Sequence, residues 1–462
     1  MLAISIVYLI SLGVWLYYNH KTANDLFSPA NILLFSWIGP VLLRSYRLSG
    51  LERDFAIETI FTLGLVSILL AVPCLITNLL VSKHRFAAKA PYFDQIARFV
   101  SNPKFLLLLG AIFIVSFVSY VYNEFVTNPI GVPLLSLNAN FEGSRDAFNR
   151  WGKDSRSLAS YLSIPVAVTS VILYSAFRYR DRGSLKYLCL FVSLLYPMCT
   201  ILKLSRIDFL NQMIMTIFAE YYWRKGRGTI KAFKPAMGSF WKAGIVVGLG
   251  LAGIMGMSAL SIYRGGFSEK GALGEILQIE AGRDTMFYPA IVESYAYFAM
   301  PIDNFAAYFE ANEGGGQIGV GMFRPLMSLT GQGPIADRET QKVEIQYPYW
   351  PVNTLTFLPM LYAESGLWGV FGGSLAYSVF VNLLYFQFRI HPTFLNIFNY
   401  IISSYAWCWL CVTNGFSVLT LYLQMFYVIA LYLSVRSLSR VRGAKVPNLS
   451  NDPVGSKLAT LW

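Results

Sequence analysis

One long hydrophilic segment, residues 263–353 of a chain of 462 residues, contains four arginines and several carboxylates. Arginine pairs with phosphate or carboxylate oxygens through a planar fork and stays charged at any working pH. A carboxylate within reach of a hydroxyl can act as a general base. The segment has no histidine or cysteine, and we see no cluster of metal-ligand type in it. Its arginines are Arg264, Arg283, Arg324 and Arg338, and its candidate bases are Asp284, Glu293 and Asp303.

The rest of the chain has the composition of a membrane protein. It is 55% hydrophobic and 13% charged overall, whereas soluble domains carry about 25% charged residues. About eleven apolar runs come near the roughly 20 residues that a helix needs to cross the hydrocarbon. These runs are too long and too evenly apolar for barrel strands, so we predict an all-α, polytopic membrane protein. The predicted spans are 2–18, 29–43, 56–81, 104–122, 157–177, 185–202, 207–223, 242–262, 366–388, 393–412 and 416–435.

The distribution of Lys and Arg orients these spans, because cytoplasmic loops carry an excess of both. Twenty of the 37 basic residues fall in the segments 82–104, 178–186, 224–242 and 436–462. With eleven spans all four segments lie on one side, which predicts an N-terminus outside, a C-terminus inside and 263–353 outside. The same distribution accounts for the net charge of +12, so we expect contact with membrane lipids and none with nucleic acid.

Three other stretches on the predicted outer face are unusually basic. They are 44–55, then 123–156 with Arg145 and Arg156, and the short turn from Lys203 to Arg206. Either one short span is miscounted, or the outer face binds an anion. We favour anion binding because Lys203 and Arg206 lie between two well-defined spans.

An apolar but short segment, 354–365, ends at Glu364-Ser365-Gly366. Either re-entry from the outer face or a break at the start of a span explains it, because irregular backbone survives at membrane depth only where protein or water covers it. Glu364 is then a functional candidate, since an ionisable residue beside an apolar span often serves function. A carboxylate that only stabilises a helix N-terminus is the alternative.

Three motifs follow one another around these residues. The first is Lys203-Leu-Ser-Arg206 at the opening of a span, and the second is Met322-Phe-Arg324-Pro325 late in the long segment. The third runs from Asn353 to Gly369 and includes Tyr362, Glu364 and two glycines three residues apart. In this order, and with this pattern of spans, they resemble the Wzy-type polymerases of bacterial O-antigen and capsule repeat units.

The resemblance implies a fold of about eleven transmembrane helices with one long periplasmic loop, similar to the GT-C glycosyltransferases. It implies a location in the bacterial inner membrane and an active site that faces the periplasm. The reaction implied is an inverting transfer of a growing glycan from undecaprenyl diphosphate to a hydroxyl of the next repeat unit. We expect no cofactor and no metal. The expected partners are polyprenyl-diphosphate-linked oligosaccharides and a regulator of chain length.

The same resemblance suggests roles for individual residues. Arg206 and Arg324 would stabilise the departing diphosphate, and Glu364 or Asp303 would act on the attacking hydroxyl, with the choice of base left open. Further substrate contacts are expected from Arg145, Arg156, Lys203, Arg264, Arg283 and Tyr362.

Four regions follow from this pattern: membrane helices in 1–262 with an outer loop at 123–156, the long outer segment 263–353 with short helices at the membrane interface, a re-entrant segment and membrane helices in 354–435, and a cytoplasmic tail in 436–462. Two other functions compete with polymerisation. O-antigen ligases resemble these polymerases but are expected to use a histidine in the large loop, whereas His20, His84 and His391 all fall on predicted cytoplasmic turns. A transporter or flippase of lipid-linked sugars usually keeps its outer loops short, so the long segment favours the polymerase.

Overall fold

The computed structural model describes residues 15, 18, 25–52, 54–82, 102–126, 187, 191, 194–195, 198–199, 206–226, 272–285, 288–312, 331, 356–413 and 419–440. Within these ranges the regular structure is helical, without strands, and three helices are long and apolar enough to cross a membrane. They are α4 (Ile57–Val81), α6 (Pro103–Val121) and α18 (Leu358–Ile390). The prediction of an all-α membrane protein is confirmed at this level. The predicted spans 2–18, 157–177, 185–202 and 242–262 lie wholly or mostly outside the described residues.

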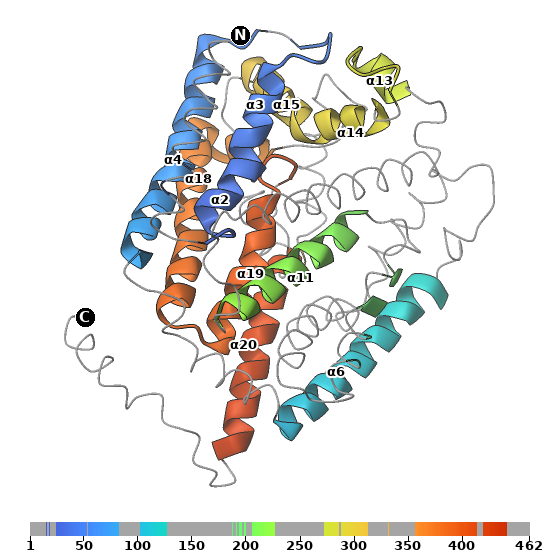
Figure 1. The fold of residues 1–462 in the computed structure, drawn as a ribbon, viewed down its shortest axis with the longest axis vertical. Coiled ribbons are helices and arrows are strands. Elements are labelled where there is room, and N and C mark those ends of the chain that lie inside the picture. Colours follow the sequence, from blue (N-terminus) through green and yellow to red (C-terminus); the bar gives the residue numbers. More distant parts are fainter. Residues whose placement is uncertain are drawn as a thin grey trace, which may run out of the picture.

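Helices α4 and α18 lie side by side and run in the same direction (Figure 1). Small polar side chains join them inside the apolar bundle: Ser378 Oγ donates to the carbonyl of Leu70 at 2.7 Å, and Asn382 Nδ2 donates to Cys74 Sγ at 3.3 Å. The second contact lies about one helical turn further along both helices than the first, so the two helices are parallel. Their N-terminal ends therefore lie at the same end of the bundle.

The first two turns of α18 are set off from the rest by a break. Ser365 and Gly366 have non-helical dihedrals, and the φ of Gly366 is +58°, a conformation that favours glycine. A Cβ on Gly369 would lie 2.0 Å from the carbonyl oxygen of Leu361. Glycine at these two positions thus allows residues 358–364 to bend back onto the long helix. The predicted break at the start of this span is confirmed.

Residues 29–45 form a helix interrupted by a π-helical stretch. α2 (Pro29–Leu33) begins at Ser28, whose hydroxyl accepts a hydrogen bond from the amide of Asn31. The π-helix η1 (Leu34–Ile38) follows and leads into α3 (Gly39–Ser45). Trp37 Nε1 donates to Ser67 Oγ at 2.9 Å and so fastens this element to α4.

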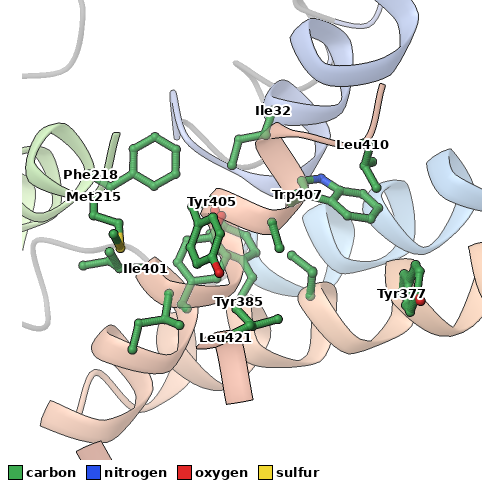
Figure 2. Packing of buried hydrophobic residues seen from close by; sticks show 14 of the residues in the cluster. Ile32, Met215, Phe218, Tyr377, Tyr385, Ile401, Tyr405, Trp407, Leu410 and Leu421 are labelled. Atoms are coloured by element: carbon green, nitrogen blue, oxygen red, sulfur yellow. The ribbon is translucent and has the colours of Figure 1, made fainter. Parts of the chain in front are cut away.

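Helices α11 (Arg206–Gly226), α19 (Phe394–Cys408) and α20 (Leu419–Arg440) complete the main bundle. Figure 2 shows large side chains from α2, α11, α18 and α19 pointing toward one another in its core. Trp407, Tyr385 and Tyr400 are fully buried there. α6 packs against α20, and the π-helix η3 (Tyr122–Val126) continues it.

Three short helices cover the end of the bundle at which α4 and α18 begin (Figure 1). They are α13 (Ala272–Ile276), α14 (Tyr288–Phe298) and α15 (Met300–Ala311), and we call the described residues from 272 to 312 the cap. Pro301 lies in the first turn of α15, where its missing N–H is tolerated. The cap is the described part of the long hydrophilic segment, and helices were predicted there.

Candidate functional site

The cap is held to the bundle by a buried ion pair between Arg44 of α3 and Asp303 of α15. Arg44 Nη2 lies 2.8 Å from Asp303 Oδ1, and Nε lies 3.2 Å from both carboxylate oxygens. Only 1% of Asp303 is exposed, and the ring of Phe55 lies 3.8 Å from the guanidinium carbon. A buried charge that loses its partner costs about 3–5 kcal/mol, so this pair fixes the position of α15.

Glu52 lies next to this pair without being tied to it. Both of its carboxylate oxygens are buried and accept no hydrogen bond of normal geometry in the part of the chain that the structure describes. Burial, and then the negative charge of Asp303, raise the pKa of Glu52 to about 7; Arg44, the backbone of Ser49 and Arg47 lower it less. We call Arg44, Glu52 and Asp303 the cap-side cluster.

The loop that carries Glu52 is attached to the cap through its backbone. The amide of Gly50 donates to the carbonyl of Gln278 at 3.2 Å, and the hydroxyl of Ser49 donates to the carbonyl of Leu277. The amide of Leu48 donates to the hydroxyl of Tyr295 at 3.3 Å. The loop before α4 and the cap therefore form one surface.

α15 also meets the N-terminal ends of both long helices. Glu310 accepts hydrogen bonds from the amide of Ala56 at 3.1 Å and from Thr59 Oγ1 at 2.9 Å, at the start of α4. A carboxylate is favourable there because the first amides of a helix lack intrahelical partners. At the start of α18, the hydroxyl of Tyr362 donates to the carbonyl of Asn312 at 2.8 Å.

The predicted acidic candidates both lie at this end of the bundle. Glu364 is only 5% exposed and lies directly before the break in α18. Asp303 lies on α15, which packs against α18, but both of its oxygens are engaged by Arg44. Because both oxygens are already bound by Arg44, the geometry suits Asp303 to positioning. Tyr362 joins α15 to the same region of α18.

The predicted basic residues are only partly described. Arg206 is the first residue of α11. That end of α11 lies with the cap, because Trp409 Nε1 donates to Asn211 Oδ1 at 2.6 Å and the amide of Phe357 donates to the carbonyl of Leu410. Arg283 lies on the cap surface and pairs with Glu280 and Glu275, and the bond with Glu280 raises its pKa. The remaining candidates lie outside the described residues: Arg145, Arg156, Lys203, Arg264 and Arg324. A converging anion site thus stays a prediction.

Sequence reasoning did not single out Glu52. The stretch 44–55 attracted notice as basic, but Glu52 lies among Arg47, Arg53 and Asp54, and such mixed signs usually mark a solvated surface. The signal available was the position itself. A carboxylate between two membrane helices, close to the turn into the second, can be covered once a distant segment docks on it.

A second buried polar cluster lies at the opposite end of α18. Asp25 accepts a hydrogen bond from Tyr385 at 2.8 Å and lies 3.4 Å from Arg389 Nη1 and 3.8 Å from Lys225 Nζ. The amide of Phe27 donates to its other oxygen at 3.2 Å. We call Asp25, Lys225, Tyr385 and Arg389 the far-side cluster. It joins the chain before α2 to the last turns of α11 and α18.

The fold and these sites define the class as a helical membrane protein with a polar cap over one end of its spanning helices. No family model, no curated protein and no solved structure matches the chain. Among the described residues no group of three His, Cys, Asp or Glu side chains is arranged to hold a metal ion.

Proposed function

We propose that this protein is a membrane glycosyltransferase that polymerises polyprenyl-diphosphate-linked oligosaccharide repeat units on the periplasmic face of the bacterial inner membrane. The observation that carries the proposal is the cap. A helical segment from the long hydrophilic insert is docked, through the buried Arg44–Asp303 pair, over the end where α4 and α18 enter the bundle. In the proposed orientation the buried carboxylates of this end would lie at the boundary between lipid and water, where a lipid-linked sugar presents its reactive bond.

The arrangement of the helix ends supports the predicted orientation. The C-terminal ends of α4, α11 and α18 lie at the same end of the bundle, as the parallel packing of α4 and α18 and the far-side cluster require. Two of these ends lead into the basic segments 82–104 and 224–242, which predict the cytoplasmic side. The cap lies at the other end, so the proposal places it in the periplasm.

The proposed reaction is a displacement at the anomeric carbon of the growing chain. The acceptor hydroxyl forms the new C–O bond and gives up its proton, while the bond to the diphosphate breaks and its electron pair stays on the diphosphate oxygen. Arg206 and Arg324 are proposed to stabilise that leaving group, since preorganised cations act strongly where charge develops. Glu364 remains a proposed acid–base group, and Asp303 is proposed to position the cap through Arg44. A direct displacement inverts the anomeric configuration.

The packing of the described bundle favours this function over transport. Where a transporter would carry its substrate between helices, the core between α2, α11, α18 and α19 is filled by large side chains such as Trp407 and Tyr385 (Figure 2). The cap-side cluster and the far-side cluster lie at the two ends of this bundle.

The test is to incubate the purified protein with a synthetic polyprenyl-diphosphate-linked repeat unit and to separate the products by size. We expect a ladder of chains that lengthen by one repeat unit, formed in the presence of a chelator. Arg206→Ala and Arg324→Ala should each lower the rate by about a hundredfold or more, and Lys at either position should rescue poorly. A wild-type protein that makes no ladder would refute the proposal. If both alanine variants make the ladder at the normal rate, the proposed anion site is refuted.

A further inference from the structure

We propose that Glu52, in place of Glu364, is the general base of this site, a role that no sequence motif assigned to it. The inference rests on the proposed function and deepens it, because it names the group that takes the proton from the acceptor hydroxyl. It is carried by three observations: a carboxylate whose buried oxygens accept no hydrogen bond of normal geometry, the electrostatic effect of a fixed ion pair on it, and the attachment of its loop to the cap.

The unengaged carboxylate distinguishes Glu52 from its acidic neighbours. Asp303 is bound by Arg44, Glu310 by Ala56 and Thr59, and Asp54 by Arg47. On the cap surface Glu275 and Glu280 share Arg283. Glu52 is the acidic group of this region, within the described residues, whose buried oxygens lack such a partner. A buried group without a hydrogen bond calls for an explanation, and a hydroxyl that donates to it during the reaction is one.

The surroundings of Glu52 suit it to accept a proton near neutral pH. The charged groups that face it are Asp303 on α15, Arg44 on α3 and Arg47 on its own loop. Asp303 is held in place by Arg44, so its negative charge acts on Glu52 without moving away. A base works best when its pKa is close to the working pH, and burial together with Asp303 brings the pKa of Glu52 to about 7.

The side chain has room to act, because its residue is partly exposed while its oxygens are turned inward. A small rotation about its side-chain bonds would bring one oxygen within reach of an incoming hydroxyl while burial and Asp303 still act on the carboxylate. The same surroundings favour the uncharged carboxyl that the transfer produces.

The proton balance of the step is complete. Ionised Glu52 takes the hydroxyl proton as the hydroxyl oxygen bonds to the anomeric carbon, and the diphosphate leaves with the electron pair of the broken bond. The proton then passes from Glu52 to water, or to the released diphosphate, before the next cycle.

The decisive variants are Glu52→Gln, Glu52→Asp and, as a matched control, Glu58→Gln. Glu58 is an exposed glutamate in the first turn of α4, and it is part of no site described above. With the synthetic lipid-linked repeat unit as substrate, the rate of wild type should rise with pH and level off above about pH 7. On the plateau above about pH 7 Glu52→Gln should lose a hundredfold or more and should lack the rise with pH, Glu52→Asp should keep part of the rate with a shifted profile, and Glu58→Gln should match wild type. A Glu52→Gln variant with the normal rate and the normal profile overturns the assignment even though the ladder, and hence the proposed function, survives.

A second measurement does not depend on activity. Infrared difference spectra between mildly acidic and mildly alkaline pH should show the carbonyl band of a protonated carboxyl in wild type and in Glu58→Gln, and this band should be missing in Glu52→Gln. Equal spectra in all three proteins overturn the inference whether or not a ladder forms. A Glu52→Gln protein that fails to fold leaves Glu52→Asp, whose band should titrate at a different pH from that of wild type.

Discussion

The two buried polar clusters at opposite ends of α18 use the same residue types in different ways. In the far-side cluster a single carboxylate, Asp25, meets two cations, a tyrosine hydroxyl and a backbone amide. In the cap-side cluster the cation Arg44 binds Asp303, and the charges of both act on a second carboxylate, Glu52. The first arrangement gives its carboxylate several partners, whereas the second leaves Glu52 with a raised pKa and with no hydrogen bond of normal geometry to its oxygens. We infer that the far-side cluster is structural and that the cap-side cluster is functional.

This difference has a physical basis. A fully paired buried charge resists change, because any alteration leaves a partner uncompensated. A carboxylate whose charge is opposed by burial and by a like-charged neighbour changes its protonation near neutral pH, which is useful to catalysis and does little for stability. Substitutions in the far-side cluster should therefore lower stability, and substitutions in the cap-side cluster should alter activity or its pH dependence.

The largest effect on stability is expected from Asp25→Asn. The substitution leaves Lys225 and Arg389 buried beside a neutral amide, so we expect the free energy of unfolding to fall by about 3–5 kcal/mol. Thermal unfolding of the purified protein in detergent measures this, with Asp54→Asn as a control. Asp54 is mostly exposed and pairs with Arg47 at the surface, so its loss should cost less than about 1 kcal/mol. Equal destabilisation by both variants would contradict the structural role of the far-side cluster.

Arg44→Ala should have a more local effect. It strands one charge, Asp303, under the cap and should cost about 3 kcal/mol, felt mainly as loss of the cap from the bundle. Hydrogen exchange should then speed up in residues 272–285 and 288–312 while the interior of α4 and α18 keeps its protection. Faster exchange throughout the bundle would mean that both clusters support the whole fold alike.

Two glycines that follow the break in α18, Gly369 and Gly372, allow a matched comparison on the cap side. Gly369→Ala places a methyl group against the carbonyl of Leu361 and should cost about 1–3 kcal/mol, whereas Gly372→Ala meets nothing within 4 Å and should be neutral or slightly stabilising. Because Glu364 lies beside the break, Gly369→Ala should also lower the rate of polymer formation. The pair is compared by thermal unfolding and by the ladder assay, and the account of the break is wrong if the two alanines behave alike.

The smallest effect concerns the pH dependence of stability. The pKa of Glu52 in the folded protein, about 7, is above its ordinary value of 4.5, so between these values the folded state binds more protons than the unfolded state. The contribution of Glu52 to stability is therefore greatest at low pH and is lost as the pH rises toward about 7. Allowing for the partial exposure of the side chain, the difference between wild type and Glu52→Gln should change by about 1 kcal/mol over this range. A pH-independent difference would contradict the perturbed environment of Glu52.

The sequence predicted the parts of this fold that depend on local pattern. Long apolar runs gave the helices α4, α6 and α18, and the glycines after Glu364 indicated the break, because both depend on neighbouring residues alone. It did not predict the partners of Arg44 or the burial of Glu52. Those arise from the docking of residues 272–312 on a loop more than two hundred residues earlier in the chain, and no local pattern specifies that contact. Asp303 is likewise a candidate base by sequence alone, whereas in the structure Arg44 binds both of its oxygens.

In the proposed function, lipid-linked sugars bind at the cap end of the bundle. Photo-crosslinking tests it most directly: a polyprenyl-diphosphate-linked oligosaccharide with a photoreactive group next to the diphosphate is bound to the purified protein, and the labelled peptides are identified by mass spectrometry. The account predicts labels in residues 44–56, in the cap and near the start of α11 or α18, reduced by an excess of unlabelled substrate. Labels confined to the chain around Asp25, Lys225 and Arg389 would contradict it.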